Sequence, residues 1–320
     1  MERSSVSKQG ISSQEVVMAD HDRLNTEIAG LSISNPVILA SGVMGTTPGG
    51  LSGIASTGAG GVTSKSLGLD PRSGHPSPNV VELAGGYLNA MGLPNPGVEE
   101  YVEELKENEI EATVFGSVYG QSPEEFKRAA KLLAPEVDGI ELNLSCPHAE
   151  KLGSAIGTDP RLVENIVNNV ARKVDKPLFA KLTPNVADIR KIGEAAESGG
   201  ADGVVAINTL KGMAIDVTTM RPILGNKSGG LSGRAIHPVA VKSVYDLYES
   251  LSIPVIGAGG VETGEDLVEL MLAGASAVQI GTAVATKGLS VFKELNSFLS
   301  DYLHSRELSL SDLVGKAHEF

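Results

Sequence analysis

The feature that most constrains the fold is a regular alternation between short apolar runs and longer amphipathic segments. Short apolar runs are typical of buried strands, and the segments between them have the periodicity of helices. The runs cover residues 37–40, 61–65, 113–117, 139–143, 178–181, 203–207, 255–257 and 277–280. Strands that alternate with helices pair in parallel, since each helix carries the chain back across the sheet. The pattern therefore predicts an α/β protein with eight parallel strands.

Eight strands in this order favour a (β/α)8 TIM barrel. Helices are expected over residues 122–134, 159–174, 186–198, 236–251 and 264–273, several of them beginning at the caps Ser122, Asp159 and Thr263. A doubly wound dinucleotide-binding sheet is the alternative, but residues 41–45 lack the Gly-x-Gly-x-x-Gly turn that it requires. Residues 68–97 and 210–234 are predicted to be long βα loop insertions over the carboxyl-terminal face, where such loops serve a site.

Composition excludes several classes of function. The chain has 320 residues and a formal charge of −13, which disfavours nucleic acid and anionic membranes as partners. No apolar run approaches the roughly 18 residues of a membrane span. Residues 1–23 are polar and rich in serine, so we expect a disordered extension before a single barrel domain over residues 24–320. One cysteine agrees with a reducing compartment, and we expect a cytoplasmic protein.

Polar residues follow almost every predicted strand. In a parallel barrel these residues meet at one mouth, where enzymes of this architecture carry their active sites. A single lysine at a strand end is usually a solvated surface residue. That explanation does not account well for two lysines and two asparagines that face one opening. The residues concerned are Ser41, Lys65, Ser117, Asn143, Lys181, Asn208 and Thr209.

The only cysteine, Cys146, lies just beyond the fourth predicted strand. A free cysteine is often a small buried hydrophobe, and that reading stays open. Pro147 ends the strand and would lift the thiol into a loop, close to the amide of Asn143. A chemical role for Cys146 is the alternative. We expect no metal site in the chain.

Two glycine pairs follow the last two strands. Gly259-Gly260 and Gly281-Thr282 stand where barrels of this type hold a phosphate on bare backbone N–H groups. Each segment alone could be a tight turn between a strand and a helix. Their occurrence together, after the seventh and eighth strands, favours a phosphate-binding site.

Several motifs together resemble the class 1 dihydroorotate dehydrogenases. The resemblance runs from about residue 24 to the end of the chain, and the segments at 208–212 and 221–233 resemble those of the NAD-linked subclass 1B. The motifs are Lys65-Ser66, Asn89-Ala-Met-Gly-Leu-Pro-Asn-Pro-Gly97, Asn143-Leu-Ser-Cys-Pro147, Lys181-Leu-Thr-Pro-Asn185, Asn208-Thr209, Gly229-Gly-Leu-Ser-Gly233, Gly259-Gly260 and Gly281-Thr282.

The resemblance implies one FMN per chain, lying across the barrel mouth. FMN would be contacted by Ser41, Lys65, Ser66, Ser117, Asn143, Lys181, Ile207 and Gly233, with its phosphate on Gly259, Gly260, Gly281 and Thr282. Dihydroorotate would be bound by Lys65, Asn89, Ala90, Met91, Gly92, Leu93, Asn143, Asn208 and Thr209. Amides suit a pyrimidine ring that carries donors and acceptors, and a lysine suits its carboxylate.

The resemblance also assigns Cys146 as the general base and places the second catalytic residue, Lys65, between the flavin and the substrate. Oxidation of dihydroorotate removes a proton from C5 and a hydride from C6, and a thiol with a reference pKa of about 8.5 can serve as that base. Membrane-bound class 2 enzymes use serine instead, so Cys146 favours class 1. Three positions depart from the family pattern, namely Ser117, His148 and Arg234.

One cysteine cannot hold an iron–sulfur cluster, and the chain lacks a dinucleotide fingerprint. The resemblance therefore implies a homodimer of this chain that associates, as a heterotetramer, with an electron-transfer subunit carrying FAD and a two-iron two-sulfur cluster. Two alternatives stay open at this point. One is a related FMN-dependent dihydropyrimidine oxidoreductase, and the other is a flavin-free, phosphate-binding barrel isomerase or aldolase.

Overall fold

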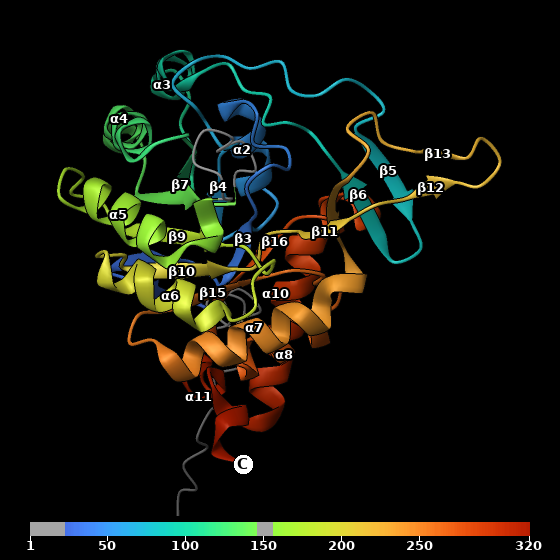
Figure 1. Cartoon of the computed structure of the whole chain (residues 1–320). Coiled ribbons are helices and arrows are strands. Elements are labelled where there is room, and N and C mark those ends of the chain that lie inside the picture. Colours follow the sequence, from blue (N-terminus) through green and yellow to red (C-terminus); the bar gives the residue numbers. More distant parts are fainter. Residues whose placement is uncertain (1–22, 146–155) are drawn as a thin grey trace, which may run out of the picture.

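A closed barrel of eight parallel strands forms the centre of the molecule (Figure 1). The computed structural model describes residues 23–145 and 156–320. All eight predicted strands are confirmed, and each barrel strand lies at one of the apolar runs. Around the barrel the order is β10-β15-β16-β3-β4-β7-β8-β9. The strands are β3 (Val37–Leu39), β4 (Gly61–Thr63), β7 (Thr113–Val118), β8 (Gly139–Asn143), β9 (Leu178–Leu182), β10 (Gly203–Ala206), β15 (Val255–Ala258) and β16 (Ala275–Ile280).

Helices cover the outside of the barrel between successive strands (Figure 1). They are α2 (Pro48–Ala55), α3 (Val98–Lys106), α4 (Pro123–Leu133), α5 (Pro160–Ala171), α6 (Ile189–Ser198), α7 (His237–Ser250), α8 (Gly264–Leu272), α9 (Ala283–Lys287), α10 (Val291–Arg306) and α11 (Leu310–Leu313). The three predicted caps are confirmed, because the side chains of Ser122, Asp159 and Thr263 accept backbone N–H bonds at the starts of α4, α5 and α8. In the described part of the chain, no helix has the length and apolarity that a membrane crossing requires.

The barrel has two hydrophobic layers. Alternate residues along each strand face opposite sides, so Val37 and Leu39 pack against the outer helices, while Ile38 belongs to an inner cluster. Phe115 and Phe179 meet edge to face in that inner cluster at a centroid distance of 5.4 Å. A hairpin formed by β1 (Thr26–Ile28) and β2 (Leu31–Ile33) adds Ile28 and Ile33 and closes the amino-terminal end of the barrel. The carboxyl-terminal end is left for polar groups.

The two insertions are more ordered than loops, because they pair with each other. The first contains β5 (Val80–Leu83) and β6 (Gly86–Asn89), and the second contains β11 (Leu210–Gly212) and β14 (Gly229–Ser232). These strands form one antiparallel sheet in the order β11-β14-β6-β5, shown to the right of the barrel in Figure 1. Leu88, Ala90 and Leu224 are buried in a small core of its own. The insertions thereby form a small sheet beside the barrel mouth.

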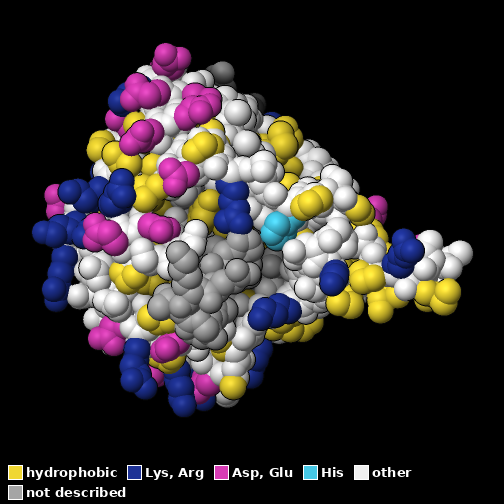
Figure 2. Space-filling model, turned by 45° about the horizontal axis from the view of Figure 1, so that its top comes forward, with side chains coloured by type: hydrophobic (Ala, Val, Ile, Leu, Met, Phe, Trp, Pro, Cys, Tyr) yellow, Lys and Arg dark blue, Asp and Glu magenta, His cyan; other side chains and the backbone are white. Residues whose placement is uncertain are grey.

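A second hairpin, formed by β12 (Ile215–Asp216) and β13 (Arg221–Pro222), extends from this sheet. It projects from the body of the molecule in Figure 2 and carries both hydrophobic and basic side chains. Exposed hydrophobic residues gather on and around it, namely Met213, Ile215, Val217 and Met220.

Candidate active site

The barrel brings the predicted polar residues to one mouth. Each of them lies at, or within three residues of, the carboxyl end of a barrel strand. Since all eight strands are parallel, these ends meet at one edge. The residues are Ser41 after β3, Lys65 and Ser66 after β4, Ser117 on β7, Asn143 on β8, Lys181 on β9, Ile207, Asn208 and Thr209 after β10, Gly259 and Gly260 after β15, and Gly281 and Thr282 after β16.

A chain of hydrogen bonds joins five of these side chains across the mouth. The hydroxyls of Ser41 and Ser66 lie 3.2 Å apart, and those of Ser66 and Ser117 lie 2.9 Å apart. The amide of Asn143 donates to Ser66 Oγ at 3.0 Å, and the amide of Asn208 donates to Asn143 Oδ1 at 3.2 Å. These hydrogen bonds fix which atom of each amide donates and which accepts. A site that binds a polar ring in one orientation requires such fixed donors and acceptors.

Three buried polar residues beneath the mouth form a second network. Lys181 Nζ lies 2.8 Å from Gln279 Oε1 and 3.4 Å from Glu141 Oε1. Gln279 Nε2 donates to Glu141 Oε2 at 2.7 Å, and Ser117 Oγ donates to Glu141 Oε1 at 3.2 Å. Glu141 and Gln279 were not among the predicted site residues. Each could have been found from the sequence as a polar side chain within an apolar strand. The interior of a barrel tolerates such a side chain only when its polar atoms are hydrogen-bonded.

Lys65 has a different environment from Lys181. Its side chain is only 7% exposed, and no acceptor or carboxylate among the described residues contacts its ammonium group. Burial lowers the pKa of Lys65, because removal from water disfavours the charged form. A buried ammonium without an anion is costly, so this position is suited to an anionic ligand.

The predicted substrate segment follows β6 and is held by the sheet of insertions. The Asn89 amide donates to the carbonyl of Gly230 in β14 at 3.2 Å, and the Ala90 N–H donates to the carbonyl of Asn79. Gly92 has φ +75°, and a Cβ at that position would lie 2.6 Å from the His75 backbone nitrogen. The sheet therefore places this segment, including Met91 and Leu93, beside the mouth.

Thr209 is placed from the other side of the mouth. Its N–H donates to Asn208 Oδ1 at 2.8 Å, and its carbonyl accepts the Asn185 amide at 3.0 Å. The Asn208–Thr209 pair is thus held by hydrogen bonds to Asn143 on β8 and to Asn185 after β9.

The turns after β15 and β16 form a cradle of backbone N–H groups. In residues 23–145 and 156–320, the N–H groups of Gly259, Gly260, Gly281 and Thr282 donate to no protein oxygen. Gly259 and Gly260 have φ +134° and +69°, and a Cβ at Gly260 would lie 2.8 Å from the carbonyl oxygen of Gly233. Four free donors on residues without bulky side chains fit the phosphate of a mononucleotide.

Two neighbours complete the cradle. The Thr282 hydroxyl donates to Ser232 Oγ at 2.9 Å, which links it to β14. The N–H of Ile207 donates to the carbonyl of Ala258 at 2.8 Å. The second insertion thus reaches the turn after β16 through Ser232, and it approaches the turn after β15 through Gly233.

Two residues named from the sequence, Cys146 and His148, lie outside the described residues. Of the other departures from the family pattern, Arg234 makes an ion pair with Asp266 at 3.4 Å and is largely exposed. Ser117 is fully buried, and its hydroxyl contacts both Ser66 and Glu141.

Comparisons with known proteins agree with this geometry. A family model described as dihydroorotate dehydrogenase matches residues 23–303. The chain is 50% identical over 301 residues to the dihydroorotate dehydrogenase B (NAD(+)) catalytic subunit of Methanocaldococcus jannaschii, covering 92% of this chain and 98% of that protein. The subunit of the same name from Methanocella arvoryzae is 52% identical over 297 residues, with 92% and 98% covered.

A solved structure of a dihydroorotate dehydrogenase, from Eimeria tenella in complex with ferulenol, superposes with a TM-score of 0.80. It covers 94% of this chain and 90% of the other at 23% identity, which supports the barrel fold. The family match decides against a flavin-free isomerase or aldolase and confirms the resemblance read from the motifs. This chain belongs to the dihydroorotate dehydrogenase family.

Proposed function

We propose that this chain is the catalytic subunit of an NAD-linked dihydroorotate dehydrogenase, which oxidises dihydroorotate to orotate in pyrimidine biosynthesis. The observation that carries the proposal is the buried ammonium of Lys65, which contacts no acceptor within residues 23–145 and 156–320, together with the hydrogen-bonded amides and hydroxyls of Ser66, Asn143 and Asn208. The substrate offers a carboxylate for the cation and a ring of alternating donors and acceptors for the amides. Residues 24–320 would act as one unit.

The cradle and the mouth suit FMN as the cofactor. The N–H groups of the two glycine turns would donate hydrogen bonds to its phosphate, and residues at the strand ends would hold its ring. When bound, FMN supplies a hydride acceptor for C6 of the substrate. Ser117 would support the site from beneath through Ser66, and would not touch the flavin itself. The residues proposed to contact FMN are Ser41, Lys65, Ser66, Asn143, Lys181, Ile207, Gly233, Gly259, Gly260, Gly281 and Thr282.

The protein's own part in the reaction is orientation and proton removal. Lys65 would bind the substrate carboxylate, and the fixed amides of Asn143 and Asn208 would set the ring in one orientation. Cys146, three residues beyond the last residue of β8, would take the proton from C5 as a thiolate. The segment of residues 89–93 and Thr209 would cover the remaining edges of the substrate.

The base can be tested apart from binding. Cys146→Ala should keep the affinity for FMN and orotate, while flavin reduction by dihydroorotate falls by roughly 10²–10⁴-fold, the usual effect of a lost general base. Cys146→Ser should retain a slow rate that rises with pH where the wild-type rate is already level, because a hydroxyl is the weaker acid. Anaerobic stopped-flow bleaching of the flavin measures both. Unchanged rates in the alanine variant would return Cys146 to the role of a small buried hydrophobe.

The route of the electrons beyond FMN requires a partner. The chain has one cysteine and therefore too few ligands for an iron–sulfur cluster of its own. The relatives are named catalytic subunits, which supports a second subunit for this chain as well. We propose that this partner carries FAD and a two-iron two-sulfur cluster and associates with a homodimer.

One experiment tests the proposed reaction as a whole. The full chain is purified, its chromophore is released and identified, and flavin reduction is followed with dihydroorotate and with dihydrouracil. The released chromophore should be FMN, and dihydroorotate should reduce it faster than dihydrouracil does. The isolated chain should transfer electrons to NAD more slowly than to a dye. FAD, no flavin after growth with riboflavin, or a preference for dihydrouracil would contradict the proposal. Fumarate and quinone complete the panel, and efficient turnover with either would contradict the NAD linkage.

A further inference from the structure

A buried histidine lies directly behind the proposed phosphate cradle. His237 is the first residue of α7, follows the turn that contains Gly233, and is 7% exposed. A Cβ at Gly260 would lie 2.7 Å from His237 Cβ, so the glycine turn packs tightly on this residue. The sequence reading did not single out His237.

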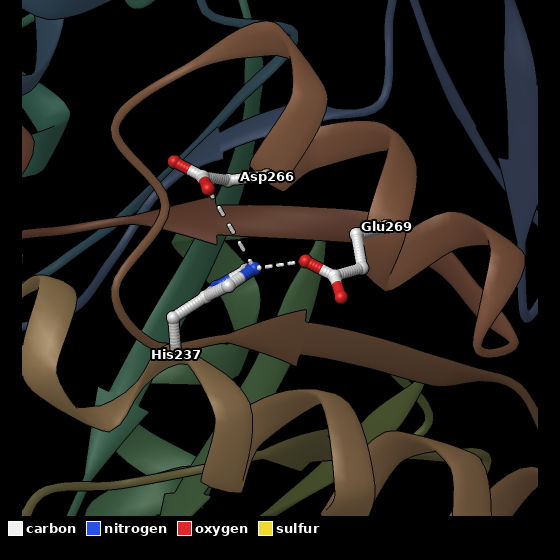
Figure 3. Close-up of side chains that lie close together, drawn as sticks. All are labelled: His237, Asp266 and Glu269. Atoms are coloured by element: carbon white, nitrogen blue, oxygen red, sulfur yellow. Dashed lines mark hydrogen bonds and ion pairs between the residues drawn. The ribbon is translucent and has the colours of Figure 1, made fainter.

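Both ring nitrogens of His237 face hydrogen-bond acceptors. Nδ1 lies 3.0 Å from the carbonyl oxygen of Gly259. Nε2 lies 3.1 Å from Glu269 Oε2 and 3.8 Å from Asp266 Oδ1 (Figure 3). A carbonyl and a carboxylate can only accept, so each contact is satisfied when that nitrogen carries a proton. The contact with Gly259 therefore requires a proton on Nδ1, which donates to the carbonyl oxygen.

Asp266 and Glu269, the two carboxylates near His237, also have other contacts or are exposed to solvent. Asp266 closes the capping box of α8, accepting from the N–H groups of Glu262 and Thr263, and it also contacts Arg234. Burial raises the pKa of Asp266, but these backbone donors outweigh burial and hold the pKa below its ordinary value. Glu269 is 58% exposed. The backbone donors and Arg234 account for Asp266, and His237 contacts Glu269, so the cluster is explained without a metal ion.

The contact with Gly259 fixes a peptide plane. In a trans peptide the carbonyl and the next N–H point in opposite directions, so holding the Gly259 carbonyl on His237 directs the Gly260 N–H away from the imidazole. That N–H is one of the four that donate to no described oxygen. Glycine turns have little intrinsic preference for one orientation, so the orientation must come from a neighbour.

We propose that His237 is a positioning residue that holds the Gly259–Gly260 peptide for the phosphate of the flavin nucleotide. The inference rests on the proposed FMN function, and it adds a residue that contacts the backbone of the cradle through Nδ1. His237 acts on the phosphate end of the cofactor and not on its ring. Its loss should therefore weaken FMN more than riboflavin, which has the same ring and no phosphate.

A set of substitutions separates the two contacts. His237→Asn keeps a donor at the position of Nδ1, His237→Gln keeps one near the position of Nε2, and His237→Leu keeps neither. The full chain is stripped of flavin, and the Kd values for FMN and riboflavin are measured by quenching of flavin fluorescence. His318→Leu is the matched control, since His318 also contacts a backbone carbonyl, that of Ala273 at 3.0 Å, and packs on α7 through Tyr245 away from the mouth.

The expected result is a weakening of FMN by about tenfold in the leucine and glutamine variants, the effect of one lost hydrogen bond that aligns a charged ligand. Riboflavin should bind equally to all variants, and the asparagine variant should bind FMN within about threefold of wild type. His318→Leu should lower the Tm and leave the ratio of the two Kd values unchanged.

Three outcomes would overturn the inference. They are wild-type FMN affinity in both the leucine and glutamine variants, equal weakening of FMN and riboflavin, or an asparagine variant as weak as the leucine variant. Failure of the proposed function would look different, because the wild-type chain itself would then bind no FMN.

Discussion

Lys65 and Lys181 are both buried near the carboxyl ends of barrel strands, yet they have opposite surroundings. Lys181 contacts the carboxylate of Glu141 and the amide of Gln279, and its charge is balanced within the protein. Lys65 contacts no acceptor among the described residues, and burial lowers its pKa. Two similar lysines at one mouth therefore differ in whether a counter-ion is built in.

The difference distinguishes a lysine whose charge is paired within the protein from a lysine whose charge is available to bind a ligand. A buried pair is costly to break, because the remaining ion has neither water nor a partner. A buried single charge destabilises the empty protein but attracts an anion strongly, because the surrounding dielectric is low. We infer that Lys181 holds the floor of the site and that Lys65 binds the substrate carboxylate.

The largest effect is expected on stability, when the carboxylate of Glu141 that contacts Lys181 is removed. Glu141→Gln should destabilise the chain by about 3–5 kcal/mol, since it leaves a buried ammonium without a charge partner. The double variant Glu141→Gln with Lys181→Met should regain most of this loss. Urea unfolding of the flavin-free chain measures both. Glu103→Gln, which breaks the exposed pair with Lys106, is the control and should leave stability almost unchanged. A silent Glu141→Gln would remove the distinction between the two lysines.

The next effect concerns catalysis at Lys65. Lys65→Ala should slow flavin reduction by dihydroorotate about 10²–10³-fold, because a charged donor is lost from a desolvated site. Orotate binding should weaken as well. Anaerobic stopped-flow and orotate titration measure these changes, with Lys173→Ala, an exposed lysine in the turn after α5, as control. Wild-type rates in Lys65→Ala would show that its charge faces no ligand.

Lys65 should also cost stability in the empty protein. Lys65→Met should raise the stability of the flavin-free chain by about 1 kcal/mol, or about 2 °C in Tm, since an unpaired buried charge is removed. Burial holds the pKa of Lys65 in the folded state below its ordinary value of 10.5, so the native state gives up the proton before the unfolded state does. The free energy of unfolding of the wild type should therefore rise relative to that of Lys65→Met as the pH increases from the folded pKa toward 10.5. A gap that grows with pH would contradict this account.

The smallest effect is expected at Ser117. Ser117→Ala removes a buried hydroxyl that contacts Ser66 and Glu141, and should cost about 1 kcal/mol in urea unfolding. FMN affinity should change less than in the His237→Leu variant, because the hydroxyl is fully enclosed. A larger loss of FMN affinity than of stability would instead show that Ser117 contacts the flavin directly.

Much of the barrel could be predicted because its signals are local. The apolar run at 178–181 became β9, and the cap Asp159 began α5, because each depends on residues within one or two turns of the chain. The insertions were predicted only as loops. Their pairing of Asn89 with Gly230 joins positions 141 residues apart, and nothing in either short strand specifies the other.

By itself, the sequence determined the order of strands and helices, the residues at each strand end and the family to which the chain belongs. The periodicity of side chains and the chemistry of caps and glycine turns are written in adjacent residues. Only the tertiary structure decided which buried charges are paired, because Glu141, Lys181 and Gln279 come from three different strands. It likewise placed His237 on the carbonyl of Gly259. Such contacts depend on the closing of the barrel, which brings distant strand ends within hydrogen-bonding distance.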